Sequence, residues 1–407
     1  MSAGIVWLLI SAALVLFMTP GLAFFYGGLV KAKSVVSMMM LSFGALGLIS
    51  VLWLLYGYNI TSTTAAEDAW IPGILGNPFA DFSLSSGSSD LVDASFGATF
   101  AIITVALVSG AIADRAKFGS WLIFAGIWGT LSYFPVAGWV WYDGWIGTLG
   151  ENMFGEGEVL DWAGGTAVHI NAGAAALALA LVLGKRAVFQ KGAHKPHNVP
   201  LVLLGAAILW FGWFGFNTGA AGTDLEAGLI FLNTIGAPAA GVLGWLIVEK
   251  LKDGKATAVG AASGAVAGLV AITPACAHLT PGWSIVLGVV AGVVSALAIE
   301  LKFKWGFDDS LDVVGIHLVA GIIGTVFLGF FATENTSLLG LFVGGGFEQV
   351  VLQTIPALAV AAYSFVIAFV VGTAIEKTIG FRVKNEDEIA GIDSVVHGES
   401  GYAIVND

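Results

Sequence analysis

The amino-acid sequence predicts an all-α integral membrane protein with eleven transmembrane helices. Hydrophobic residues make up 57% of the 407 residues and charged residues only 11%, whereas soluble domains carry roughly 25% charged residues. Apolar runs long enough to cross the hydrocarbon layer, which takes about 20 helical residues, recur along the whole chain. The basic residues between these runs lie on alternate links only. These three observations indicate a chain that crosses the membrane many times.

Eleven spans follow from the lengths of the apolar runs. Their approximate ranges are 4–30, 34–60, 94–112, 119–142, 162–184, 198–221, 226–248, 256–274, 282–301, 311–332 and 353–377. The first run has no basic segment before it and is long enough to span, so we interpret it as a helix of the mature fold and not as a signal peptide. The 56 glycines favour close packing of these helices.

The distribution of charge supports the count of eleven spans. All 16 Lys and Arg residues lie in links after odd-numbered spans or in the tail, and the even-numbered links contain none. A miscount giving ten or twelve spans would have mixed the two sets. The even-numbered links instead carry acidic residues, among them Glu67, Asp68, Asp81, Asp90, Asp143, Glu151, Glu156, Glu158, Asp224, Glu226, Glu334 and Glu348. The positive-inside rule therefore places the amino terminus outside a plasma (inner) membrane and the carboxyl terminus in the cytoplasm.

Two similar motifs occupy the fifth and tenth spans. The fifth contains H-I-N-A-G from His169, and the tenth contains H-L-V-A-G from His317. Each histidine follows an aspartate near the start of its helix, Asp161 and Asp312. Because the fifth span runs inward and the tenth outward, the matching positions indicate an inverted repeat with a pseudo-twofold axis in the membrane plane.

This repeat predicts the domain organisation. We expect inverted repeats at about 4–184 and 198–332, followed by a single last span at about 353–377. Residues 1–380 would then form the transmembrane domain, and 381–407 a polar cytoplasmic tail. A disordered end is the alternative interpretation of that tail.

His169 and His317 are the two of six histidines that lie well inside spans, each about 10 Å along its helix. Starting from opposite faces, they are expected to approach the midplane from both sides. A polar residue at that depth is a functional candidate, because an unpaired polar group in hydrocarbon is costly. Imidazole can also hold or relay a proton near neutral pH. A hydrogen bond between helices is the structural alternative.

Metal, redox and enzymatic functions have little support. Cys276 is the only cysteine, which excludes a disulfide within the chain and a cysteine-based metal cluster. Neither cysteine nor buried glutamate accompanies the histidine pair as a further ligand. No set of nucleophile, base and orienting group can be assembled within the membrane. We therefore expect no enzyme activity, no cofactor, no bound metal and no nucleic-acid partner.

Aromatic residues cluster near the ends of several spans on the acidic side. They are Phe96 and Phe100, then Trp139, Trp141 and Trp145, then the segment from Phe211 to Asn217. Interfacial belts are the general explanation of such clusters, but an indole face also holds a cation without a counter-charge. Asp161 either caps its own helix through the first amides or contacts such a cation directly.

Several motifs, in order along nearly the whole chain, resemble the ammonium transporter (Amt/Mep/Rh) family, and specifically its bacterial Amt type. They are F-F-Y-G-G-L from Phe24, D-W-A-G-G from Asp161, K-P-H-N from Lys195, G-W-F-G-F-N from Gly212, T-P-A-C from Thr273, D-V-V-G-I-H from Asp312 and D-S-V-V-H-G-E from Asp393. The resemblance implies eleven helices in a pseudo-symmetric bundle, a homotrimer with one pore per subunit, and a PII-type regulator at the cytoplasmic face.

The resemblance also implies roles for particular residues. Trp141 and Phe100 match an outer recruitment site supported by Asp161, Phe100 and Phe216 match a stacked gate, and His169 and His317 match the twin histidines of the pore. Ala220 stands where family members often have a serine, which removes one acceptor worth about 1 kcal/mol for the ion. The regulatory segment of the tail would comprise Asp393, His397, Gly398 and Glu399.

The expected function is transport of ammonium or ammonia across the lipid bilayer. An ion that cannot enter an apolar pore while charged would give up its proton near the gate, and ammonia would then pass the histidines. Whether the proton follows through the histidine pair or returns outside is open at this stage. The alternatives are an ammonium sensor with the same fold and an ion-coupled carrier of small solutes. No signalling module is appended, and no charged residues lie mid-span.

Overall fold

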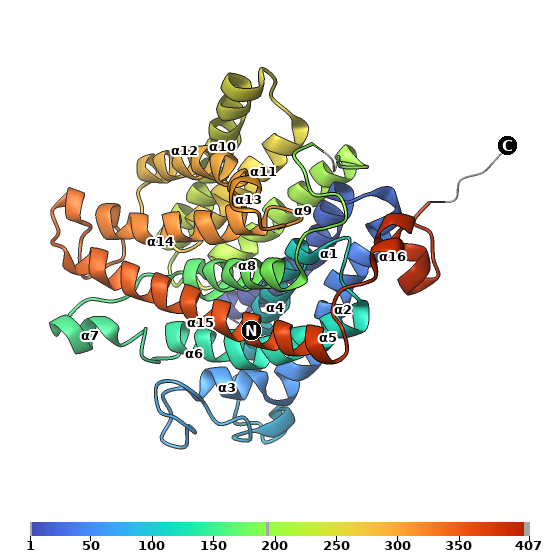
Figure 1. Ribbon diagram of the computed structural model, residues 1–407. Coiled ribbons are helices and arrows are strands. Elements are labelled where there is room, and N and C mark those ends of the chain that lie inside the picture. Colours follow the sequence, from blue (N-terminus) through green and yellow to red (C-terminus); the bar gives the residue numbers. More distant parts are fainter. Residues whose placement is uncertain (1, 193–194, 403–407) are drawn as a thin grey trace.

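The computed structural model describes residues 2–192 and 195–402. Among these residues, ten helical segments are long and apolar enough to cross a membrane, and α11 (Ala258–Ile272) is a shorter apolar helix. Together they match the eleven predicted spans, with every end within five residues of its prediction. The helices pack side by side into one bundle (Figure 1). The predicted all-α membrane fold is therefore confirmed.

The first five spans contain seven α-helices, because the second and fourth spans are interrupted. They are α1 (Ala3–Leu29), α2 (Val35–Leu52) with α3 (Tyr58–Ser62), α4 (Leu91–Val108), α5 (Phe118–Trp128) with α6 (Phe134–Trp141), and α8 (Asn171–Leu183). The later spans, besides α11, are α9 (Val199–Thr218), α10 (Asp224–Asp253), α12 (Pro281–Ala298) with α13 (Leu301–Trp305), α14 (Ala320–Phe331) and α15 (Glu348–Thr378). Two short helices outside the spans, α7 (Leu149–Phe154) and α16 (Asn385–Ala390), had no counterpart in the sequence analysis.

Both spans that carry a mid-membrane histidine begin with a π-helical turn. The turn η6 (Gly165–Ile170) precedes α8 and contains His169, and η7 (Val314–Val319) precedes α14 and contains His317. Such π turns are rare and occur frequently at functional sites, because they change the direction in which a side chain points. The two histidines therefore sit in the same unusual backbone setting.

The span η6–α8 forms the centre of the bundle (Figure 1), and 83% of it is buried inside the protein. A glycine permits its close contact with the other histidine segment. A Cβ atom at Gly173 would lie 2.5 Å from the backbone nitrogen of Leu318. Small residues let helices in a membrane approach to backbone distance, so the A-G pair after each histidine serves helix packing.

The tail is described through residue 402 and packs against the bundle, where the π turn η9 (Asp393–His397) contacts α2. The carboxylate of Asp393 accepts hydrogen bonds from the amides of Val36 and Ser37, at 3.0 and 2.8 Å. It thereby caps the first turn of α2, where amide donors are otherwise unpaired. The alternative of a disordered end is thus wrong for residues 381–402, while the last five residues lie outside the described part of the chain.

Candidate transport pathway

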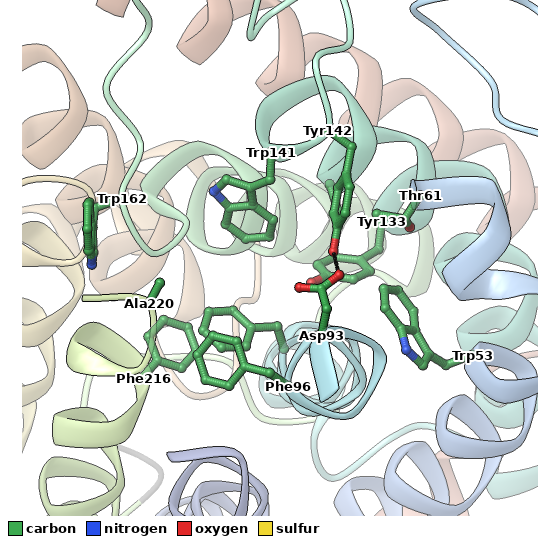
Figure 2. Close-up of a pocket in the computed structure, with 13 residues that line it drawn as sticks. Trp53, Thr61, Asp93, Phe96, Tyr133, Trp141, Tyr142, Trp162, Phe216 and Ala220 are labelled. Carbon is green, nitrogen blue, oxygen red and sulfur yellow. Dashed lines mark hydrogen bonds between the residues drawn. The ribbon is translucent and has the colours of Figure 1, made fainter. Parts of the chain in front are cut away.

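A cavity of about 240 Å³ opens at the end of the bundle where the acidic links gather. Figure 2 shows residues that line it. We call it the aromatic cavity, because eight of its thirteen lining residues are Trp, Tyr or Phe. Its lining residues are Trp53, Thr61, Asp93, Phe96, Gly97, Phe100, Tyr133, Ala137, Trp141, Tyr142, Trp162, Phe216 and Ala220. Three residues predicted for the recruitment site, Phe100, Trp141 and Ala220, therefore share one cavity.

The floor of the aromatic cavity is a pair of stacked phenyl rings. Phe100 of α4 and Phe216 of α9 have ring centroids 4.1 Å apart and planes inclined by 18°. Trp141 stands edge-on to Phe100 at 5.9 Å between centroids. Both phenylalanines are almost fully buried, so this stack separates the cavity from the interior.

Beyond the stack lies a second, narrow cavity of about 10 Å³, which we call the histidine cavity. Phe216 borders both cavities. The rest of the lining is apolar except for the imidazoles of His169 and His317 and the indole of Trp213. The lining residues are Met18, Leu22, Phe25, Ile103, Leu107, Val168, His169, Leu209, Trp213, Phe216, Val266 and His317. A space of this size holds about one water-sized molecule. Both predicted pore histidines face it.

The two histidines contact each other directly inside the protein. Nδ1 of His169 and Nδ1 of His317 are 3.2 Å apart, and the rings are inclined by 23°. One nitrogen must therefore carry the proton that the other accepts. The ring of His169 also stacks on Trp213 with centroids 5.5 Å apart. Within the described residues, Nε2 of His169 has no hydrogen-bond partner from the protein.

Asp161 supports the aromatic cavity from behind and does not line it. Its two carboxylate oxygens accept the amides of residues 164–167 at 2.5 to 3.2 Å. Its carbonyl oxygen accepts the indole N–H of Trp141 at 2.9 Å. Burial raises the pKa of Asp161 to about 6, although the four amide bonds act in the opposite direction. Of the two roles considered from the sequence, the geometry matches the capping role.

The sequence analysis matched Asp312 with Asp161 as equivalent positions of the two histidine spans, and the structure corrects this match. Asp312 binds the ammonium group of Lys302 at 2.5 Å, with φ of 64°, and the structure gives its carboxylate no contact with helix amides. Asp309 instead accepts the amide of Val314 at 2.7 Å, next to η7. Asp309 precedes His317 by eight residues, as Asp161 precedes His169. That equal spacing makes Asp309, and not Asp312, the counterpart of Asp161.

The opposite end of the pathway carries several charged groups. A cavity of about 260 Å³, the charged cavity, is bordered by Asp114, Arg186, Lys302 and Asp312 among others. Arg186 pairs with Asp114 at 3.1 Å and with Asp308 at 2.8 Å, all three being buried. Burial alone would raise the pKa of Asp308, but the hydrogen bond and charge of Arg186 hold it below its usual value.

The predicted regulatory segment lies near the charged end and away from both other cavities. Asp393 and His397 belong to the π turn η9 (Asp393–His397), and the ring of His397 packs on Phe118 at 5.5 Å between centroids. Gly398 follows with φ of 67°, and the amide of Glu399 points back to the carbonyl of Asp393 at 3.5 Å. These residues contact the starts of α2 and α5.

Sequence reasoning missed several polar or aromatic residues of the aromatic cavity, which are Trp53, Thr61, Asp93, Tyr133, Tyr142 and Trp162. A signal for Asp93 was available. It precedes Phe96 by three residues and Phe100 by seven, so all three lie on one face of a helix. Trp162 donates its indole N–H to the carbonyl of Asn217 at 2.7 Å, a contact between distant segments that no local pattern predicts.

A helical membrane bundle with an aromatic cavity, a phenyl stack and an enclosed histidine pair defines a membrane transport protein. Comparison with known proteins narrows the class. The model of the Ammonium Transporter Family matches residues 6–402. An ammonium transporter of Mycobacterium tuberculosis is 49% identical over 430 aligned positions, covering 97% of this chain and 89% of that protein. One from Bacillus subtilis is 42% identical, covering 98% of both.

Solved structures agree with this assignment. The crystal structure of Candida albicans Mep2 superimposes with a TM-score of 0.83 at 30% identity, covering 95% of this chain and 87% of that one. A structure described as a sensor Amt protein gives a TM-score of 0.86 at 25% identity, covering 97% and 98%. The chain therefore belongs to the ammonium transporter family. It is a multi-pass membrane protein that transports ammonium, and its family is one of transporters and not of enzymes.

Proposed function

We propose that the aromatic cavity recruits the ammonium ion between Trp141 and Phe100, with Asp161 holding the indole in place. A cation over an indole face gains about 0.5–2 kcal/mol without a formal counter-charge, which permits later release. The carbonyl of Asp161 fixes the indole N–H, and its carboxylate holds the loop through four amides. Ala220, on the cavity wall, offers no hydroxyl to the ion.

The ion gives up its proton near the Phe100–Phe216 stack, and the imidazole of His169, whose ring centroid lies 6.2 Å from that of Phe216, accepts it. The histidine cavity is lined almost entirely by apolar side chains and has room for about one small molecule. A full charge in such a space carries a large desolvation penalty, whereas neutral ammonia does not. The phenyl stack therefore serves as the gate that ammonia crosses.

The histidine pair accepts ammonia in the passage and carries the proton. Nε2 of His169 borders this cavity and has no hydrogen-bond partner among the described residues, so it is available to a small solute. The direct Nδ1 contact of 3.2 Å permits a proton to move between the rings. The single observation that carries this proposal is a contacting pair of imidazoles inside an otherwise apolar cavity. If the proton moves through this pair together with ammonia, one positive charge crosses the membrane with each ammonium ion.

Current and internal pH in proteoliposomes test this mechanism. Ammonium is expected to produce a current that potassium does not, and the double variant His169→Ala/His317→Ala is expected to lose or alter it. An undiminished current in the double variant would remove the histidines from the mechanism. Flux of ammonia without current would mean that the proton returns to the side of entry.

Matched variants separate the aromatic roles from general damage. Trp141→Leu is expected to raise the KM for ammonium, whereas Trp139→Leu is not, because Trp139 packs on Tyr363 and does not border the cavity. Phe216→Leu is expected to weaken discrimination against larger ions. Phe214→Leu is its control, because Phe214 stacks on Phe231 at 4.3 Å.

The orientation follows from charge. The aromatic cavity faces outward and the charged cavity faces the cytoplasm of a plasma membrane, so that the amino terminus is outside. The supporting observation is the absence of Lys and Arg from the links of the acidic side. Accessibility of a cysteine introduced at Glu156 or at Lys191, to a reagent that cannot cross the membrane, tests it in a Cys276→Ala background.

The assembly and its regulation are extensions of the family resemblance. The protein forms a homotrimer with one pathway per subunit, and a PII-type protein binds at the cytoplasmic face near the tail segment Asp393, His397, Gly398 and Glu399. The packing of this segment on α2 and α5 supports a route from such a partner to the bundle. Native mass spectrometry tests the trimer, and co-purification with a PII protein tests the partner.

The inverted repeat is proposed for residues 4–184 and 198–332, followed by the last span and the tail from 381. Its support is the shared order of aspartate, π turn and histidine in two segments of opposite predicted direction. Superposition of the two halves through a twofold rotation tests it.

A sensor role is the second candidate, favoured by the likeness to the structure described as a sensor Amt protein. Ammonium binding without flux in the proteoliposome assay would support it over the mechanism above.

A further inference from the structure

Asp93 is the one side chain with a formal charge among the residues that line the aromatic cavity. It lies in the first turn of α4, three residues before Phe96 and seven before Phe100. It is half-buried, so it faces the cavity and still contacts water. Figure 2 shows its carboxylate on the cavity wall below Tyr142, on the side of the cavity opposite Ala220.

Two tyrosines hold this carboxylate through the same oxygen. Oδ2 of Asp93 accepts the hydroxyl of Tyr58 at 2.9 Å and that of Tyr142 at 2.5 Å. The described residues supply no hydrogen bond to Oδ1. The tyrosines thus fix the orientation of the carboxylate while one oxygen keeps its acceptor capacity.

Asp161 cannot serve as the counter-charge in this cavity. All four hydrogen bonds of its carboxylate come from amides of its own loop, and Asp161 does not border the cavity. Ala220 provides no polar group either. An ion with four N–H donors, resting on the indole of Trp141, would therefore find its one anionic acceptor on the wall formed by α4.

We propose that Asp93 is the anionic contact of the ammonium ion in the aromatic cavity, and that it takes the place of the hydroxyl missing at Ala220. The proposal rests on the recruitment at Trp141 described above. The ligand class is ammonium and small primary alkylammonium ions such as methylammonium, which place N–H donors on the free oxygen. Potassium, which has no N–H donor, gains less from an oriented acceptor.

The test compares Asp93→Asn with Asp90→Asn in proteoliposomes. Both variants remove one negative charge from the same end of α4, and both keep an acceptor, but Asp90 is exposed and caps the helix outside the cavity. Asp93→Asn is expected to raise the KM for ammonium and for methylammonium about three- to tenfold with little change in maximal rate. Asp90→Asn is expected to leave both unchanged.

Trp141→Leu separates this inference from the recruitment site itself. If Trp141→Leu raises KM and Asp93→Asn does not, Asp93 is no ligand and the recruitment site stands. If neither changes KM, both proposals are wrong. An equal effect of Asp90→Asn would reduce Asp93 to a general surface charge, and a loss of maximal rate at constant KM would assign it a structural role.

Asp93→Glu covers the case in which Asp93→Asn does not reach the membrane. It keeps the charge and moves it one methylene further into the cavity. It is expected to change the ratio of KM for methylammonium to KM for ammonium, because the larger ion has less room beside it. An unchanged ratio overturns the proposal.

Discussion

The two π turns that carry the histidines, η6 and η7, have the same local pattern but are stabilised by different contacts. In each, an aspartate stands eight residues before the histidine and a π turn carries the ring. Asp161 accepts four amides of the loop that follows it, whereas the carboxylate of Asp309 accepts the amide of Val314 and has one oxygen without a partner. Lys302 donates a hydrogen bond to the carbonyl oxygen of Asp309 at 2.9 Å and so anchors the main chain there.

This difference shows that one end of the pathway is stabilised locally and the other by long-range charge pairs. Asp161 and the four amides that its carboxylate accepts are neighbours in sequence, so these amides are satisfied within one loop. The charged end depends on Arg186 and Asp308, which come from separate links. Buried ion pairs of this kind are costly to break, because the remaining partner is left charged and unpaired.

The largest effect is expected from Asp161→Ala. Four amides would lose their acceptor in a buried site, and each unpaired buried group costs about 1–3 kcal/mol. We expect little folded protein, and a partial recovery in Asp161→Asn, which keeps one acceptor oxygen. Yield and apparent Tm after purification in detergent measure this, with the exposed Glu156→Ala as the control. Normal stability of Asp161→Ala would contradict the local role.

A smaller but still large effect is expected from Arg186→Leu. It leaves Asp114 and Asp308 buried without their partner, at a cost of about 3–5 kcal/mol. Lys191→Leu is the matched control, because its pair with Glu300 is at the surface and contributes about 0–1 kcal/mol. Thermal unfolding compares the two. Equal losses in both variants would show that burial of the charge pairs is not what stabilises this end.

The smallest effect is a pH dependence of stability at Asp309. Burial raises the pKa of this carboxyl from 3.8 to about 6, while Lys302 acts in the opposite direction. The folded state therefore binds the proton more tightly than the unfolded state does. The stability of the wild type relative to Asp309→Asn should fall as pH rises from about 4 to about 6 and stay constant above.

Thermal unfolding of both proteins across that range is the measurement. A difference that is constant with pH would mean that Asp309 ionises as easily in the folded protein as in the unfolded chain. A difference that grows with pH would mean that its pKa is lowered, and the contrast with the ion-paired Asp308 would disappear.

Much of the site was accessible from the sequence through its composition and spacing. His169 and His317 stood out because polar groups are rare in apolar spans, and both line one cavity. The spacing of Asp309 to His317 repeats that of Asp161 to His169, but Asp312 is nearer to the helix start and is therefore the capping residue that a local pattern predicts. Asp312 binds Lys302 and does not cap the helix. This contact depends on how α13, which carries Lys302, is positioned in the folded protein.

The sequence by itself determined the number of spans, their ranges and the segregation of charge, because an apolar run of sufficient length between polar links is a local property. Only the tertiary structure decided which faces of distant helices meet. It brought Phe100 onto Phe216, His169 into contact with His317, and Asp93 into the cavity of Trp141. These contacts depend on helix packing to within an ångström, and a one-dimensional pattern specifies the face of a helix but not the partner that the face meets.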